Sequence, residues 1–278
     1  MAIVVTGATG NVGRPLVAEL VAAGAEVRAV SRRPDAAGLP AEVKVVDTAA
    51  AAIPGASAVF LNSRALGEEM ASAVRQAQRE GVSRLVALSA INADDDFSRQ
   101  PSRYRGDRNK EADQLASESG LEWVSLRPSV FATNFAGMWS PQTRAGDVVN
   151  GPYAAASSAP IVESDIASVA AQALLSDDLV GQRIPMTGPQ PLTNSEMIEI
   201  IGSVLRRPLH YNEIPAEFVR QRFIELGFGA EFADAYIAML ATTLDRPAPV
   251  TDDVERILGR PAQSFERWVS EHTTLFTN

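Results

Sequence analysis

The sequence predicts an α/β fold, with a doubly wound parallel sheet followed by a smaller, mainly helical part toward the C-terminal end. A β-branched apolar run at residues 2–6 leads directly into a glycine-rich turn, and an apolar stripe at helical spacing follows. Further apolar runs alternate with helical patterns up to about residue 188, the order that βαβ units produce. Some runs, such as residues 58–61, contain no polar residue, which is typical of strands buried on both faces of a parallel sheet.

The first turn carries three glycines at the spacing G-x-x-G-x-x-G, between residues 7 and 13. In a strand–turn–helix unit one glycine opens the turn, one lets the backbone approach a pyrophosphate, and one lets helix and strand pack closely. The amides and the positive dipole at the start of the helix then favour phosphate groups. An ordinary turn that binds nothing is the alternative. As a dinucleotide site, the turn offers Gly7, Thr9, Gly10, Asn11, Val12 and Gly13 as contacts.

The second predicted strand, residues 27–31, ends in Ser31-Arg32-Arg33. At this place a dinucleotide fold meets the adenosine ribose, where an acidic residue favours NAD and arginine accommodates the 2′-phosphate of NADP. No carboxylate follows until Asp35, and guanidinium groups match phosphate geometry while keeping their charge. A solvated basic turn is the alternative. The sequence therefore favours NADP(H) over NAD(H) as the cofactor, held here by Ser31, Arg32 and Arg33.

Three further predicted strands end in polar residues: 43–47 in Asp47, 58–61 in Asn62-Ser63 and 84–89 in Ser89. Ligands of open α/β sheets bind outside the carboxyl ends of the strands, so Asn62 and Ser63 are candidate cofactor contacts. Between the last two of these strands, residues 66–80 have the apolar spacing of one helix.

Residues 92–106 indicate a loop, and the acidic run Asp94-Asp95-Asp96 within it is more typical of a solvated surface than of a metal site. A helix is expected from about 107 to 119 and a sixth strand over 121–128. Beyond about residue 190 the pattern is mostly helical.

Two stretches more than a hundred residues apart resemble one protein family. T-G-A-T-G-x-x-G, at residues 6–13, resembles the opening of the short-chain dehydrogenases/reductases in their extended and atypical branches. Arg127-Pro128-Ser129 and the residues up to Phe135 closely resemble the NmrA-like atypical reductases, and the likeness continues to Phe265. The resemblance implies a Rossmann-type domain at residues 1–150 with returning elements from about 160 to 188, and a smaller substrate or lid region at 189–278. Among the returning elements it implies a helix behind the sheet, which Ser164 is placed to cap, and a seventh strand over 183–188.

The resemblance also implies roles for single residues. Asp47 is expected beside the adenine and Ser89 near the nicotinamide. The loop after Arg127-Pro128 is expected to cover the nicotinamide and begin the substrate pocket, which makes Pro128 and Ser129 cofactor contacts. The substrate contacts implied there are Phe131, Asn134, Phe135 and Trp139. With Met138 the aromatic residues would form an apolar wall, although core packing explains any one of them equally well.

The usual catalytic pair of the superfamily, Tyr-x-x-x-Lys, is absent. The residue four before Lys110 is Gly106, and Tyr104 has the wrong spacing to share a helical face with that lysine. NmrA-like relatives often carry a lysine or histidine near this point, and alignment back from Gly120 places either Asn109 or Lys110 there. At about 100° per residue Lys110 points away from the expected core stripe while Asn109 lies close to it, so both stay catalytic candidates.

Composition excludes several other functions. The chain has 278 residues, no cysteine, two histidines and a formal net charge of −9. Disulfides, thiolate metal sites and a cysteine nucleophile are excluded, and we expect no metal site. The acidic balance argues against nucleic-acid binding. No apolar stretch reaches the roughly 18 residues of a membrane span, and no secretory signal begins the chain. We expect a cytoplasmic monomer or homodimer whose partner is a small-molecule substrate.

The sequence supports two functions of different classes. The first is an NADP(H)-dependent oxidoreductase that reduces a small quinone-, enone- or carbonyl-type molecule. A quinone or enone is favoured because its reduction does not need a strong protein acid, since the chemistry lies in the cofactor. The second is a non-catalytic dinucleotide-sensing regulator, which the missing tyrosine fits equally well. An epimerase or dehydratase with tightly held NAD is a third option, against which Arg32 and Arg33 argue.

Overall fold

The structure is a computed structural model that describes residues 2–277. It divides into two compact units, each made of discontinuous segments. Unit 1 comprises the chain up to Ala93, Gly106–Pro128 and Glu163–Pro185, and unit 2 comprises Asp94–Arg105, Ser129–Val162 and the chain from Met186 onward. Residues 129–150, placed with the first domain on sequence grounds, therefore group with unit 2.

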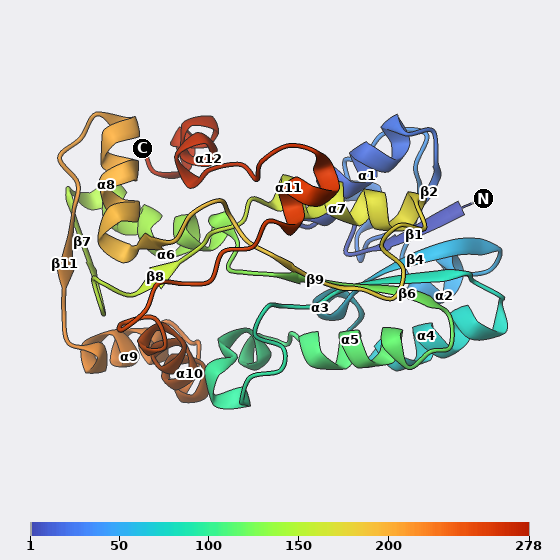
Figure 1. The fold of residues 1–278 in the computed structure, drawn as a ribbon, viewed down its shortest axis with the longest axis horizontal. Coiled ribbons are helices and arrows are strands. Elements are labelled where there is room, and N and C mark those ends of the chain that lie inside the picture. Colours follow the sequence, from blue (N-terminus) through green and yellow to red (C-terminus); the bar gives the residue numbers. More distant parts are fainter. Residues whose placement is uncertain (1, 278) are drawn as a thin grey trace. The chain divides into compact units, whose positions relative to one another are not determined.

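Unit 1 is built on a sheet with seven strands over the described residues, in the order β3-β2-β1-β4-β5-β6-β9 (Figure 1). The strands are β1 Ala2–Thr6, β2 Glu26–Val30, β3 Lys44–Val46, β4 Ala56–Asn62, β5 Arg84–Leu88, β6 Glu122–Pro128 and β9 Arg183–Met186. Pairing is parallel from β3 to β6. The chain runs outward from β1 to β3 and then returns to β4 on the other side of β1, so the strand order reverses between β1 and β4. This confirms the predicted doubly wound α/β fold.

Helices cover both faces of this sheet. They are α1 Gly13–Ala22, α2 Ala49–Ala52, α3 Ser63–Leu66, α4 Met70–Arg79, α5 Asn109–Ser117 and α7 Glu163–Leu175. α1 and α7 lie together on one face, whereas α2, α4 and α5 lie on the other (Figure 1). On that second face β4 and β5 contribute Val59, Leu61 and Leu85 to a buried apolar cluster with α4 and α5. The uninterrupted apolar strands of the sequence are thus buried on both sides, as expected.

Two expected helices differ in their limits. The single helix expected over 66–80 is divided, because Gly67 adopts a left-handed φ of +54° that ends α3, and the 3₁₀ turn Gly67–Glu69 precedes α4. Asn62 caps α3 instead. The predicted cap at Ser164 is wrong, because α7 already begins at Glu163 and Ser164 lies inside its first turn.

The segment expected as a loop over 92–106 contains two 3₁₀ helices, η3 Phe97–Arg99 and η4 Pro101–Arg105. The acidic run at residues 94–96 is exposed, as predicted, and the Asp96 carboxylate caps η3 by accepting from the Ser98 amide at 2.8 Å. The stretch after Pro128 is also more regular than expected. It becomes helix α6, Ala132–Ala145, because Ala132, Phe135, Ala136 and Trp139 bury one helical stripe.

Unit 2 is mainly helical. Besides α6 its helices are α8 Asn194–Leu205, α9 Ala216–Glu225, α10 Ala230–Ala241, α11 Asp253–Leu258, α12 Phe265–Glu271 and the 3₁₀ turn η5 Thr273–Leu275. Short strands form two small ribbons, β7 Val148–Gly151 with β11 His210–Glu213 and β8 Ser157–Ser158 with β10 Leu192–Thr193. Phe135, Trp139, Phe265 and Trp268 are at the centre of its core.

Candidate active site

The glycine turn joins β1 to α1 with very little space between the two. Gly7 has a φ of +67°, a left-handed conformation that favours glycine. A Cβ on Gly13, the first residue of α1, would lie 2.1 Å from the Gly7 carbonyl oxygen. The Gly10 amide donates to that oxygen at 3.0 Å. The helix can therefore start directly over the turn, which aims its first amides outward from the end of the sheet.

The exposed part of the turn is Thr9, Gly10 and Asn11, whereas Val12 is 3% exposed and offers a ligand its backbone alone. Below them the Thr6 hydroxyl donates to the Phe60 carbonyl at 2.8 Å and accepts from the Asn62 amide at 2.9 Å. These two bonds fix the turn against the end of β4.

Asn62 and Ser63 are partly engaged in holding unit 1 together. The Asn62 carboxamide oxygen accepts from the Arg64 and Ala65 amides at 3.1 and 3.3 Å, which caps α3. Ser63 is buried, and its hydroxyl accepts from the Arg108 amide at 3.0 Å. Both residues lie beside the glycine turn, since a Cβ on Gly7 would lie 2.9 Å from the side-chain nitrogen (Nδ2) of Asn62. Their contact with a cofactor stays a prediction.

The end of β2 lies next to the turn, because the Ala8 amide donates to the Val30 carbonyl at 3.3 Å. Ser31 is buried and its hydroxyl accepts from the Arg33 amide at 3.3 Å, whereas the side chains of Arg32 and Arg33 are exposed. Two guanidinium groups are thus available beside the turn, on the side where β2 ends. Asp47 is exposed after β3.

Arg14 is a residue of this region that sequence reasoning missed. Its guanidinium donates to the Gly38 carbonyl at 2.7 Å and to the Ala37 carbonyl at 3.0 Å. It thereby ties the segment after Arg32 and Arg33 to the first turn of α1. No local sequence pattern predicts these two bonds, because their acceptors are backbone carbonyls more than twenty positions along the chain.

Ser89 and the two catalytic candidates come together at the start of α5. Ser89 is buried and its hydroxyl donates to the Asn109 carbonyl at 2.9 Å. Asn109 is the first residue of α5, and both Asn109 and Lys110 are half-buried. Neither residue is therefore fully exposed to solvent. Nearby, Arg64 holds Asp107 through two bonds of 2.7 and 2.9 Å.

Asp113 is a second residue that sequence reasoning missed. Its carboxylate, on α5, accepts from Ser125 and Arg127 of β6 at 2.9 and 2.6 Å and from Arg183 of β9 at 2.9 Å. Burial acts to raise the pKa of this carboxyl group, but its bonds to Arg183, Arg127 and Ser125 outweigh burial and hold the pKa below its usual value. Asp113 therefore remains ionised and joins one helix to two strands.

The remaining candidates belong to unit 2, except for Pro128 at the end of β6. The Ser129 hydroxyl donates to the Ala159 carbonyl at 2.6 Å, and Phe131 forms a β-bridge with Ile161. Asn134 is exposed. These three residues open the α6 segment, and their contact with a cofactor or substrate stays a prediction.

Phe135 and Trp139 are deep in unit 2, at 3% and 4% exposure. Phe135 lies edge-on against Phe265 with ring centroids 5.8 Å apart, and Trp139 lies edge-on against Tyr211 at 6.3 Å. Their burial is explained by the core of unit 2, which is the alternative that the sequence left open for them. Met138, half-buried on the same helix, has more surface to offer.

The glycine turn and its neighbours fit a dinucleotide. The close approach at Gly7 and Gly13 leaves no room for side chains, and exposed guanidinium groups stand where an adenosine phosphate would be held. Within residues 2–277, no three His, Cys, Asp or Glu side chains gather in a way that could hold a metal ion. None of the described helices has the length and apolarity needed to cross a membrane.

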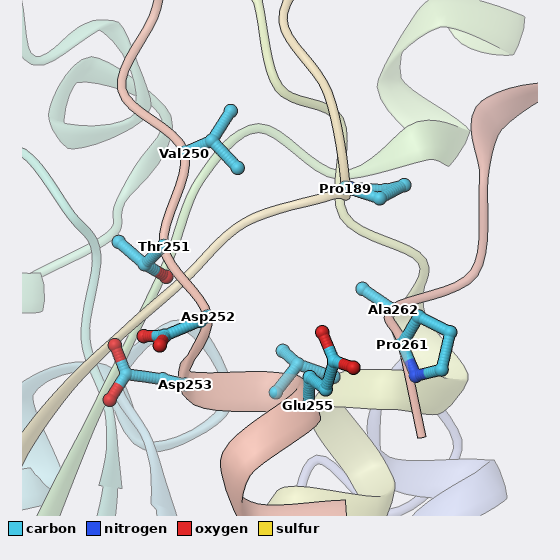
Figure 2. Close-up of a pocket in the computed structure, with 9 residues that line it drawn as sticks. Pro189, Val250, Thr251, Asp252, Asp253, Glu255, Pro261 and Ala262 are labelled. Atoms are coloured by element: carbon cyan, nitrogen blue, oxygen red, sulfur yellow. The ribbon is translucent and has the colours of Figure 1, made fainter. Parts of the chain in front are cut away.

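Unit 2 also contains an open cavity of about 560 Å³. Figure 2 shows Asp252 and Asp253 on one side of it and Pro261 and Ala262 on the other. Asp253 forms an ion pair with Arg256 at 2.5 Å, and the Thr251 amide donates to the Thr187 hydroxyl at 3.0 Å. Because its walls are acidic, this cavity does not suit the phosphates of a dinucleotide.

Comparison with known proteins agrees with this geometry. A family described as NAD(P)H-binding matches residues 7–177, which include the glycine turn and strands β2 to β6. The chain belongs to this family. More closely, it is a member of the NmrA-like, atypical short-chain dehydrogenase/reductase group, a family of NAD(P)H-dependent reductases.

Two curated members of the family are similar over nearly their whole length. The (4-alkanoyl-5-oxo-2,5-dihydrofuran-3-yl)methyl phosphate reductase of Streptomyces griseus is 32% identical, with 99% of each chain covered. The NAD(P)H azoreductase of Xenophilus azovorans is 29% identical, again with 99% of each chain covered.

Among solved structures, an NADPH-dependent quinone oxidoreductase from Escherichia coli matches with a TM-score of 0.80 at 18% identity, covering 98% of this NmrA-like chain and all of the other. A triphenylmethane reductase from Citrobacter matches with a TM-score of 0.78 at 16% identity, covering 99% of this chain and all of the other. At these identities the likeness establishes the fold.

Proposed function

We propose that this protein is an NADP(H)-dependent oxidoreductase that reduces a small quinone-, enone- or carbonyl-type molecule. The observation that carries the proposal is the pair of exposed guanidinium groups, Arg32 and Arg33, at the end of β2 beside the glycine turn. Arginine at this place accommodates a 2′-phosphate, whereas an acidic residue would bind the free ribose hydroxyls of NAD.

The residues of unit 1 have distinct parts in this proposal. Gly7 to Gly13 hold the pyrophosphate over the start of α1, and Arg14 keeps the segment after Arg33 in place. Asp47 contacts the adenine, Asn62 and Ser63 line the end of β4, and Ser89 orients the start of α5. Pro128, and Ser129 in the segment of unit 2 that follows it, are the proposed contacts of the nicotinamide.

A nicotinamide cofactor held by these residues would supply a hydride, and an acceptor such as a quinone would take up that hydride and one proton to become a hydroquinone. Because the hydroquinone oxyanion is weakly basic, water or a hydrogen-bonded side chain is sufficient as the proton source. Lys110 and Asn109 are the side chains proposed for that part. Solved complexes of the E. coli quinone oxidoreductase with NADPH and of the Citrobacter reductase with NADP(H) support this choice of cofactor class.

The missing Tyr-x-x-x-Lys pair favours a second candidate, a regulator that senses the dinucleotide without turnover. The two functions differ in a simple way. A reductase consumes NADPH when given an acceptor, whereas a sensor binds the cofactor and leaves it unchanged.

The test is a titration of the purified protein with NADPH and NADH, followed by nicotinamide fluorescence, and then a panel of quinones and enones followed by NADPH absorbance. We expect tighter binding of NADPH, loss of that preference in Arg32→Ala, and NADPH consumption with a quinone. Arg79→Ala, on the exposed side of α4, removes the same charge from a helix without cofactor candidates and should keep the preference. Binding without consumption would favour the sensor, and absence of binding would refute both.

A further inference from the structure

Four aromatic rings of unit 2 form a surface outside its core. Phe223, Phe228, Phe232 and Tyr236, here called the aromatic face, are each half-buried on or between α9 and α10. Phe223 contacts each of the other three, with ring centroids 5.1–5.3 Å apart. None of the four belongs to the fully buried core of this unit around Phe135 and Trp268. Aromatic rings that pack on one another while staying partly exposed offer stacking surface to a planar ligand.

Three of these rings form a line. Phe232 and Tyr236 are four residues apart on α10, which places them on one side of that helix, and Phe228 lies just before the helix begins. The centroids of Phe228 and Phe232 are 4.8 Å apart, and the rings of Phe232 and Tyr236 are parallel within 7° at 6.2 Å. These two successive ring contacts make the line long enough for a ligand of two or three fused rings.

At one end of the line, the Tyr236 hydroxyl has a weak partner. It donates to the Met138 sulfur at 3.2 Å, and a thioether is a poor hydrogen-bond acceptor. Burial raises the pKa of this phenol well above its usual value, so it stays protonated and remains a donor. A carbonyl or quinone oxygen would be a stronger acceptor for this hydroxyl than the sulfur is.

At the other end, Arg105 places its guanidinium 4.5 Å from the centroid of the Phe228 ring. Within the described part of the chain, no carboxylate lies within ion-pair distance of Arg105. Two arginines of α9 differ in this respect, because Arg220 pairs with Asp234 at 2.6 Å and Arg222 with Glu225 at 3.5 Å. In a chain of net charge −9, an exposed and uncompensated guanidinium on an aromatic ring is a local site for an anion.

We propose that the aromatic face binds the reducible substrate, and that this substrate is a planar aromatic acceptor with an anionic substituent such as a sulfonate, carboxylate or phosphate. Its rings pack against Phe228 and Phe232, its anionic group pairs with Arg105, and its oxygen accepts from the Tyr236 hydroxyl. The proposal deepens the reductase function and rests on it for the identity of the ligand as a substrate, whereas the binding itself is measured without cofactor.

The experiment compares two anthraquinones that differ in charge. Equilibrium dialysis of the full chain, without NADPH and at low salt, measures binding of anthraquinone-2-sulfonate and of uncharged 2-(hydroxymethyl)anthraquinone. We expect the sulfonate to bind more tightly. Arg105→Gln should weaken sulfonate binding about tenfold, as for loss of a hydrogen bond to a charged group, with little effect on the uncharged probe. Tyr236→Phe keeps the ring and should weaken both probes to the same extent.

Arg222→Gln is the matched control, because it removes the same charge from an exposed arginine of unit 2 that has its own carboxylate partner. It should leave both affinities unchanged. Arg105→Lys retains the charge without the planar fork and should give an intermediate result. Equal binding of the two probes by the unmodified protein, no binding of either, or an equal loss in Arg222→Gln would overturn the proposal. A protein that binds the sulfonate as described and yet never oxidises NADPH would refute the reductase function while leaving this binding face in place.

Discussion

Replacing Gly13 with alanine tests whether the glycine turn is the cofactor site. The added Cβ would lie 2.1 Å from the Gly7 carbonyl oxygen and 2.8 Å from the Ala8 Cα, where ordinary contacts begin at 3.4 Å. All of these neighbours are backbone atoms, so the start of α1 must move away from the turn by about 1 Å. Overpacking of this kind costs about 1–3 kcal/mol, and a misplacement of about 1 Å in a binding site can cost about 100-fold in function.

The assay is a fluorescence titration with NADPH alongside a thermal melt. We expect Gly13→Ala to lose about 100-fold in NADPH affinity and to lower Tm by about 2–4 °C per kcal/mol lost. Gly24→Ala is the control at the other end of the same helix. Gly24 has a φ of +78° with no atom within 4 Å of an added Cβ, so alanine there costs about 1 kcal/mol of backbone strain and leaves the turn intact. Unchanged NADPH affinity in Gly13→Ala, or an equal loss in Gly24→Ala, would refute the assignment of the turn.

Three further predictions concern α5. Asp113→Asn should lower the free energy of unfolding by about 3–5 kcal/mol in a denaturant titration, because Arg127 and Arg183 lose the charge that compensates them, whereas the exposed Asp178→Asn should change it little. Because the pKa of Asp113 is lower in the folded than in the unfolded state, its stabilisation is complete above the unfolded value near 4 and is lost as the pH falls through the folded value. An acid titration of stability should therefore show a loss below about pH 4 that Asp113→Asn lacks, and identical pH profiles would contradict this. Of Lys110→Met and Asn109→Ala, the one that removes the proton donor should lower kcat by about 10²–10⁴-fold with NADPH affinity unchanged, and no loss in either would leave water as the donor.

Strong local signals made most of unit 1 predictable from the sequence. Residues 2–5 of β1 and 58–61 of β4 are uninterrupted apolar runs, and the glycine turn could be placed because a strand precedes it and a helix follows. Errors occurred where a single residue outweighed the pattern. The apolar spacing of residues 66–80 continues through Gly67, but that glycine takes a left-handed conformation, and the preceding Asn62 supplies a cap for the separate helix α3.

The candidate substrate residues show a different limit of prediction from sequence. Phe135 and Trp139 have the apolar character expected of a substrate wall, but the same character places them in the core of unit 2. The residues that distinguish these possibilities are Phe265 and Tyr211, which are contributed by distant segments that no local pattern connects to α6. The buried stripe of α6 itself was present in the sequence at helical spacing. It shows that the stretch after Pro128 is a packed helix as well as a continuation of a cofactor motif.

Arg127 illustrates how one motif can combine structure and function. It belongs to the Arg127-Pro128-Ser129 stretch on which the family resemblance rests. The role that the resemblance implies for this stretch is contact with the cofactor. In the structure its guanidinium donates to Asp113 at 2.6 and 2.8 Å, and the same carboxylate also holds Arg183 of β9. Asp113 is one turn along α5 from Asn109 and Lys110. The ionised carboxylate therefore fixes the end of β6 and the start of α5 relative to each other. The helix that carries the catalytic candidates and the strand that leads to Pro128 are positioned by one buried charge.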